Sequence, residues 1–119
     1  MYLTDTPSSA LFETLVHFDL DPDELPEHFQ LLRVEIPEHA MCEDLTEDDL
    51  PENWRQYEEL TRNMGDAWLE KGETLLLGVP SSIVPHTRNY LFNPAHEDAT
   101  ECELYAEEHQ YDHRLFKIR

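Results

Sequence analysis

The sequence predicts a single domain of the α+β class, and three observations lead to this prediction. Two stretches have the apolar spacing of amphipathic helices, several others have the length or alternation of short strands, and the two kinds do not follow the regular strand–helix–strand order of a parallel α/β sheet. At 119 residues, of which 39% are hydrophobic, the chain can bury one core but is too short for two. We therefore treat residues 1–119 as one domain.

The first helix is expected close to the N-terminus. Tyr2-Leu3 has the character of a strand end, and Thr6 and Pro7 then supply a cap and a residue suited to the first helical position. Apolar residues recur at helical spacing from there to about Phe18. A short strand followed by a helix is therefore predicted at the start of the chain.

The second helix is expected in the middle of the sequence. It covers residues 61–71 and ends at Gly72, the residue type that most often follows the last helical turn. Before it, residues 38–53 are acidic and weakly patterned, which indicates a surface connection with one helical turn at residues 47–50.

Three further stretches are predicted to be strands. Residues 30–37 alternate apolar and polar side chains more clearly than any other part of the chain. Residues 101–106 alternate in the same way, and residues 111–118 carry the apolar anchors of a last strand.

The stretch from residue 76 to residue 96 is organised by its prolines. An apolar run stops at Pro80, two serines follow, Ile83-Val84 resumes the run, and Pro85 interrupts it again, which predicts two short strands around a bend. Ser81 stands at that bend, where a rigidly held hydroxyl can orient a ligand. The alternative is that Ser81 only caps the turn through bonds to its own backbone.

The charge of the chain is the strongest signal in its composition. With 27 acidic against 8 basic residues, the net charge is −19, which argues against nucleic acid or anionic membrane as partners. The carboxylates are spread along the whole chain, as in proteins of a salt-adapted, halophilic cytoplasm; the alternative is a basic partner that docks on the acidic surface. The sequence has no membrane-length apolar run and no signal-peptide pattern, so we expect a soluble cytoplasmic protein.

Other chemical motifs are weak. Cys42 and Cys102 form no paired motif, so we expect neither a disulfide nor a zinc–cysteine site. His109, Asp112 and His113 have ligand spacing only on a helix, whereas the surrounding sequence indicates strand or coil, and we expect no metal there. No nucleophile-elbow motif of a serine hydrolase is present.

Five segments together resemble the RES domain family in the order in which they occur. They span almost the whole chain and read YLTDTPSSALFETLVHF, LPENW, MGDAWL, VPSSIVPHTRNYLFNPAH and YDHRLF. The resemblance implies a fold similar to ADP-ribosyltransferases. It also implies a toxin of a toxin–antitoxin pair that degrades NAD+ as a glycohydrolase or phosphorylase, with NAD+ as substrate and no further cofactor.

The resemblance also assigns roles to individual residues. Glu13 and Ser81 match the Glu and Ser after which the family is partly named, and we expect them to be catalytic. Tyr2 matches an aromatic position on the strand before the helix. Asn89, Asn93 and His96 match the family's N.L.NP.H pattern and are expected to shape the floor of the NAD+ pocket; by its pattern alone, His96 is expected to order a loop and not to act as a base.

The family's Arg precedes the strand at Tyr2, in a glycine-rich segment that this sequence does not match. We therefore expect a domain that lacks the N-terminal segment of the family, with half of the usual site. The alternative function is a catalytically inactive remnant that binds an antitoxin or a second copy of itself.

Overall fold

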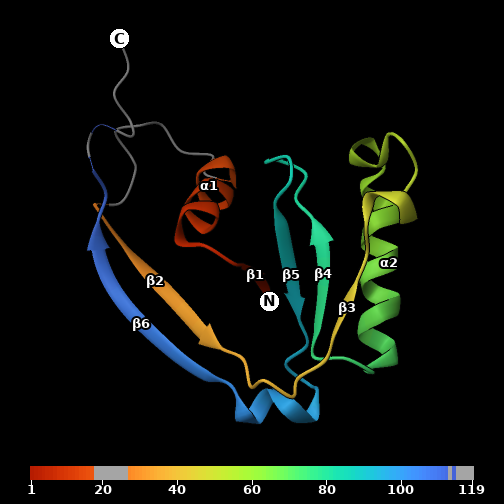
Figure 1. Ribbon diagram of the computed structural model, residues 1–119. Coiled ribbons are helices and arrows are strands. Elements are labelled where there is room, and N and C mark those ends of the chain that lie inside the picture. The colour runs from red at the N-terminus through yellow and green to blue at the C-terminus, as the bar shows by residue number, and fades with distance from the viewer. Residues whose placement is uncertain (18–26, 113, 115–119) are drawn as a thin grey trace.

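The computed structural model describes residues 1–17, 27–112 and 114. It contains two sheets and two α-helices, so the expected α+β class is confirmed (Figure 1). No helix in the described part of the chain combines the length and hydropathy that a membrane span requires.

The main sheet has four strands in the order β1-β5-β4-β3. Its central pair, β4 (Leu76–Pro80) and β5 (Arg88–Phe92), forms an antiparallel hairpin, which confirms two short strands around a bend. Strand β1 (Tyr2–Thr4) pairs antiparallel with β5, and β3 (Cys42–Asp44) pairs parallel with β4. The N-terminal strand is therefore an edge strand next to the hairpin.

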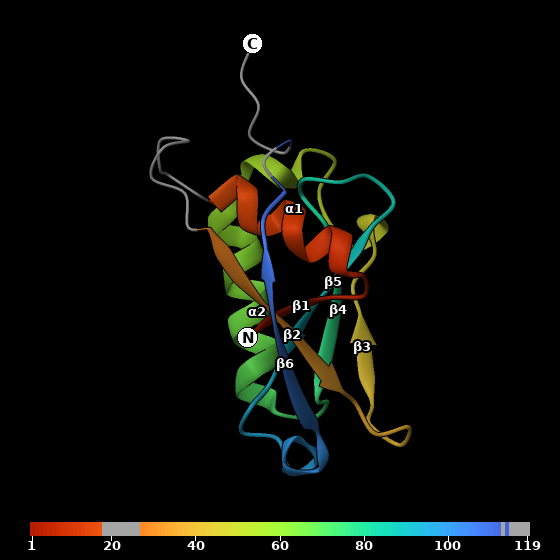
Figure 2. The ribbon, with the colours of Figure 1, turned by 90° about the vertical axis from the view of Figure 1, so that its left-hand side faces the viewer.

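Helix α2 (Glu58–Lys71) covers one face of this sheet (Figure 2). Gly65 faces β5, since a Cβ at this position would lie at an ordinary contact distance of 3.4 Å from Leu91 Cδ1. Leu75 and Leu77, at 0% and 1% exposure, are buried in the main sheet and just before it. Trp68 of α2 donates a hydrogen bond from Nε1 to Thr74 Oγ1 at 2.8 Å. The core therefore lies between α2 and the strands that carry the bend.

Helix α1 (Pro7–His17) crosses the end of the main sheet at which the bend lies (Figure 2). The predicted cap is confirmed, because Thr6 Oγ1 accepts from the backbone N–H of Ser9 at 3.1 Å. Phe18, the expected end of the helix, lies outside the described residues.

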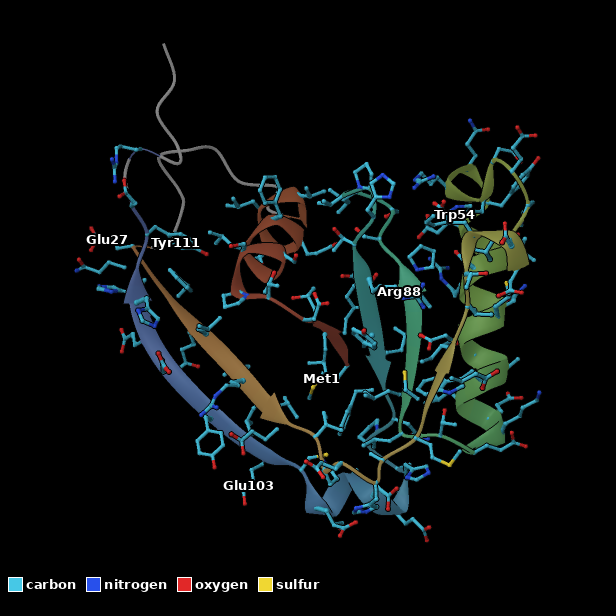
Figure 3. The ribbon with its side chains drawn as sticks, viewed as in Figure 1. Met1, Glu27, Trp54, Arg88, Glu103 and Tyr111 are labelled. Carbon is cyan, nitrogen blue, oxygen red and sulfur yellow. The ribbon has the colours of Figure 1, made fainter. Side chains whose placement is uncertain are left out.

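The second sheet is a ribbon of two antiparallel strands, β2 (His28–Glu35) and β6 (Glu103–Gln110). It lies to one side of the main sheet (Figure 1), and its open end carries a further backbone bond from Tyr111 N to Glu27 O at 3.1 Å (Figure 3). Every residue of β6 is exposed. This strand of the ribbon thus contributes no buried residue to the core.

The described residues also form three short 3₁₀ helices: η2 (Glu47–Asp49), η3 (Trp54–Gln56) and η4 (Glu97–Glu101). The first of these confirms the helical turn expected at residues 47–50. The C-cap of α2 is also confirmed, since Gly72 has φ +61°, the left-handed conformation that glycine adopts without steric cost.

Several predicted boundaries were wrong. Ile83-Val84 is not a strand, because the backbone N–H groups of both residues bond to Ser81 Oγ instead of a neighbouring strand. Helix α2 begins three residues before the predicted start, and β6 continues four residues beyond residue 106. Strand β3 lies within residues 38–53, where only a surface connection was predicted. Of the last strand predicted over residues 111–118, residues 111 and 112 are not in a strand, and residues 113 and 115–119 lie outside the described part.

Candidate active site

Ser81 caps the bend between β4 and β5, as the second of the two interpretations of its sequence position predicted. Its side-chain oxygen accepts from the backbone N–H groups of Ile83 at 3.2 Å and Val84 at 3.1 Å. Its own backbone N–H donates to Thr87 O at 2.9 Å and closes the bend. These bonds hold the side chain, which is only 2% exposed, in a fixed position.

The same hydroxyl donates to Glu13 Oε1 on helix α1 at 3.0 Å. A hydroxyl has one hydrogen to donate and two lone pairs, so Ser81 uses its whole hydrogen-bonding capacity in these three bonds. The capping interpretation of Ser81 is therefore confirmed, and the same side chain also bonds to Glu13. Orientation of a ligand by this hydroxyl stays a prediction.

Asn89 supplies the second donor to Glu13. It follows the bend on β5, it is fully buried, and its Nδ2 donates to Glu13 Oε1 at 2.8 Å and to the Tyr2 hydroxyl oxygen at 3.0 Å. Within the described residues its Oδ1 has no hydrogen-bond partner. One amide thus links the carboxylate of α1 to the ring of the adjacent edge strand.

Glu13 receives both donors on one oxygen. Ser81 and Asn89 each bond to Oε1, and in the described part of the chain no protein donor bonds to Oε2. The side chain is half-buried, so the carboxylate is oriented by the protein while keeping access to solvent. The two donors fix the position of Oε1 and leave Oε2 available to a ligand.

Tyr2 combines an exposed ring with a bound hydroxyl. The residue is 51% exposed, and its ring lies on the edge strand next to Asn89. Burial around the hydroxyl raises the pKa of the phenol above its ordinary value of 10.0, and the charge of Glu13 raises it further, although the bond from Asn89 acts in the opposite direction. The phenol is therefore neutral at physiological pH.

Asn93 and His96 do not join this cluster. Asn93 bonds through its backbone N–H to Leu75 O at 2.9 Å, at the opposite end of the β4–β5 hairpin from Ser81. Its Oδ1 accepts from Ala95 N at 3.0 Å, and His96 Nδ1 accepts from Asp98 N at 3.0 Å. These bonds order the loop before η4, which agrees with the loop-ordering role predicted for His96 and places neither residue beside Glu13.

A cavity of about 280 Å³ opens on the other side of Ser81. Its lining residues are Glu47, Pro80, Ser81, His86, Thr87 and Arg88. The guanidinium of Arg88 reaches across β4 and donates to Asp44 Oδ1 at 2.9 Å (Figure 3). Arg88 and His86 were not among the site residues predicted from the sequence, although an arginine beside the NYL motif of so acidic a chain was a usable signal.

The sequence profile of the family described as "RES domain" matches residues 1–114, which include the four clustered residues Tyr2, Glu13, Ser81 and Asn89. The chain belongs to the RES domain family. The expected family is thereby confirmed.

Curated relatives of this RES domain are named as toxins. The chain is 40% identical over 116 residues to "Toxin Res" of Pseudomonas putida KT2440, covering 98% of this chain and 79% of the relative. It is 39% identical to "Toxin Res" of Yersinia enterocolitica, covering 86% of this chain and 66% of the relative. It is 36% identical to "Prs ADP-ribosylating toxin" of Sphingobium sp. YBL2, covering 83% of this chain and 63% of the relative.

Proposed function

We propose that this RES domain, spanning residues 1–119, is the NAD+-degrading toxin of a toxin–antitoxin pair. The observation that carries the proposal is the carboxylate of Glu13, held through Oε1 by Ser81 at 3.0 Å and Asn89 at 2.8 Å. A fixed carboxylate with one oxygen left for a ligand suits stabilisation of positive charge at a sugar carbon. The family and the name of the Sphingobium relative, an ADP-ribosylating toxin, support NAD+ as the substrate.

The proposed reaction breaks the bond between the ribose C1′ and the nicotinamide nitrogen. The bonding electron pair moves to the pyridinium nitrogen, which becomes neutral, and the ribosyl group becomes oxocarbenium-like. Glu13 stabilises this positive charge, because a preorganised carboxylate interacts most strongly where charge develops. Water or phosphate then attacks C1′; a water nucleophile releases its proton to solvent.

The neighbouring residues act by positioning. Ser81 and Asn89 hold Glu13, while the exposed ring of Tyr2 offers a surface for stacking a planar ring of the substrate. The cavity beside Ser81, at about 280 Å³, is just below the usual range of about 300–1,000 Å³ for ligand pockets, so it fits one portion of a dinucleotide. Arg88, whose guanidinium also pairs with Asp44 at 2.9 Å, is the residue of this lining that would contact an anionic pyrophosphate, although the carboxylate of Glu47 lines the same cavity.

The test is to measure NAD+ loss by this chain, with and without phosphate, and to separate the products by chromatography. We expect free nicotinamide together with ADP-ribose, or with its phosphorylated form when phosphate is the acceptor. Glu13→Gln should abolish the loss, whereas Glu59→Gln, on the exposed first turn of α2, should leave it unchanged. Equal NAD+ loss by Glu13→Gln and the unaltered chain would overturn the role of this carboxylate.

The second candidate is a protein-binding domain without catalysis, and the exposed ribbon favours it. Leu32 and Leu104 lie on one face of it with 56% and 61% exposure, and the carboxylate of Glu108 lies on the same face. A partner with apolar residues flanked by basic ones, such as an antitoxin segment, complements this surface. No NAD+ loss by the unaltered chain, combined with binding that Leu104→Glu weakens, would favour this function.

A further inference from the structure

A second cluster of chemically active side chains lies far from Glu13, where the loop after β2 meets η4 at the base of the ribbon (Figure 1). His39 Nε2 is 2.9 Å from Glu101 Oε2 and 3.7 Å from Asp98 Oδ1. The three atoms lie within 4.8 Å of one another, and they come from segments about 60 residues apart in sequence. The fold thus brings one imidazole and two carboxylates to a single point.

These separations suit a tetrahedral metal ion. Ligand bonds of about 2.0–2.2 Å to imidazole nitrogen and carboxylate oxygen place neighbouring donor atoms about 3.4 Å apart around zinc. The two measured distances from His39, 2.9 Å and 3.7 Å, lie on either side of that value. By contrast, His109 and His28 each face one carboxylate, from Glu107 at 3.1 Å and Glu108 at 3.8 Å.

Asp98 is the least exposed of the three clustered side chains. Its side chain is 20% exposed, against 59% for His39 and 52% for Glu101. In the described structure its carboxylate forms two long ion pairs, with His39 Nε2 at 3.7 Å and with His96 Nδ1 at 3.8 Å, and His96 Nδ1 already accepts the backbone N–H of Asp98. The Asp98 carboxylate therefore keeps acceptor capacity at the point where His39 and Glu101 meet.

His96 has a supporting role in this arrangement. Its side chain is 10% exposed, and its bond to Asp98 N at 3.0 Å fixes the backbone that carries Asp98. Groups that orient metal-binding side chains in this way commonly change metal affinity by about 10-fold to 100-fold when they are removed. His96 therefore positions the segment that carries Asp98, one of the three clustered side chains.

We propose that His39, Asp98 and Glu101 bind one divalent ion of the zinc class, with water in the remaining coordination position. The nitrogen and two oxygens suit such an ion better than calcium, which prefers six or more oxygen ligands. The ion would join the loop after β2 to η4, the segment that leads into β6. Its effect is to fix the base of the β2–β6 ribbon against the rest of the molecule.

Co²⁺ is the probe of choice, because its visible absorption reports the coordination geometry. The complete chain is freed of metal with a chelator and titrated with Co²⁺, and we expect one equivalent to produce an absorption band of tetrahedral type that Zn²⁺ abolishes. His39→Ala and Asp98→Asn should each lower the affinity at least about tenfold. His39 is 59% exposed on its side chain, so its replacement leaves the core intact, as circular dichroism can verify.

The matched control is His109→Ala, which removes an exposed histidine that faces one carboxylate instead of two. This variant should bind Co²⁺ as the unaltered chain does. Zinc should also raise the unfolding temperature of the unaltered chain and of His109→Ala, but not that of His39→Ala. Absence of a stoichiometric band, or equal loss of affinity in both histidine variants, would show only diffuse binding to an acidic surface and would overturn the proposal, whatever the outcome for NAD+.

Discussion

Glu13 Oε1 receives hydrogen bonds from residues that lie 68 and 76 positions away in the sequence. Such a carboxylate is easily taken for an ordinary solvated residue of an acidic helix, because no local pattern reveals its donors. Its position depends on the bend that holds Ser81 and on the pairing of β1 with β5, which brings Tyr2 beside Asn89. The geometry of the candidate site therefore comes from the hairpin as much as from α1.

The first prediction concerns the buried amide at the centre of this cluster. Asn89→Asp replaces the donor that lies 2.8 Å from Glu13 Oε1 with a second carboxylate, so two negative charges would face each other. We expect the free energy of unfolding at pH 7 to fall by about 1–3 kcal/mol, measured by urea denaturation. Asn63→Asp on the exposed surface of α2 is the matched control; an equal loss in both variants would contradict the burial argument.

The second prediction concerns the titration of Tyr2. Burial, aided by the charge of Glu13, raises the pKa of its phenol above 10.0 in the folded chain. Because the folded pKa exceeds the unfolded one, the associated stability is present below pH 10 and is lost as the pH rises through the folded pKa. Comparison with Tyr2→Phe identifies the phenolate absorbance that belongs to Tyr2. This absorbance should appear at higher pH in the folded chain than in the chain unfolded in urea. An equal or lower titration midpoint in the folded chain would contradict the prediction.

The candidate site was predictable from the sequence only in part. Glu13, Ser81, Tyr2 and Asn89 were assigned through the family resemblance, since spacing alone was only weak evidence for a site that combines Glu13, Ser81 and Tyr2. Asn93 and His96 were assigned to the same pocket because they follow Asn89 closely in one motif. In the structure, the length of β5 separates them from the bend, because a motif that is continuous in sequence can extend along a whole strand.

At the scale of elements, the sequence predicted the helices and strands that have a strong apolar pattern or that end at a capping residue, a glycine or a proline. The α1 cap, the proline bend and the C-cap at Gly72 were all found, since each depends on local backbone chemistry. Strand β3 was missed because Cys42–Asp44 is fully exposed and shows no apolar alternation; it exists through its pairing with β4. Such an element depends on a partner more than 30 residues away, which a local pattern does not reveal.

The third prediction compares two glycines in different elements. A Cβ at Gly78 on β4 would collide with Asp44 Oδ1 and lie 3.0 Å from the Arg88 guanidinium, so Gly78→Ala should break the Asp44–Arg88 ion pair. We expect a loss of about 1 kcal/mol in the free energy of unfolding.

Gly65→Ala is the control for this substitution. Its Cβ would meet Leu91 at an ordinary 3.4 Å, and alanine favours a helix, so we expect no loss or a gain of about 0.5–1 kcal/mol. Urea denaturation of both variants measures the difference. Equal stability of the two variants would show that the contact at Gly78 relaxes without cost.

At the scale of the whole molecule, the charge is the dominant feature. Even if each of the 8 basic residues paired with one acid, 19 of the 27 acidic residues would have no compensating charge. The ion pairs of Arg33, Arg55 and Arg62 lie on the surface, where such pairs contribute little to stability. Repulsion among the remaining carboxylates must therefore destabilise the compact chain at low ionic strength.

The last prediction is that potassium chloride stabilises this protein. The screening length falls from about 10 Å at 0.1 M salt to about 3 Å at 1 M, which weakens the repulsion between carboxylates on neighbouring elements. We expect the unfolding temperature to rise by about 5 °C across this range, equivalent to roughly 1 kcal/mol for a domain of this size. Differential scanning calorimetry at several salt concentrations measures the change.

A charge-reduced variant separates screening from a general salt effect. Asp66→Asn, Glu70→Gln and Glu73→Gln together remove three exposed carboxylates on and after α2. This variant should be more stable than the unaltered chain at 0.1 M salt, and its unfolding temperature should rise less on addition of salt, because less repulsion remains to be screened. The same rise in both chains would show that salt acts through hydration of the whole surface, and the composition would then give no evidence of adaptation to a saline cytoplasm.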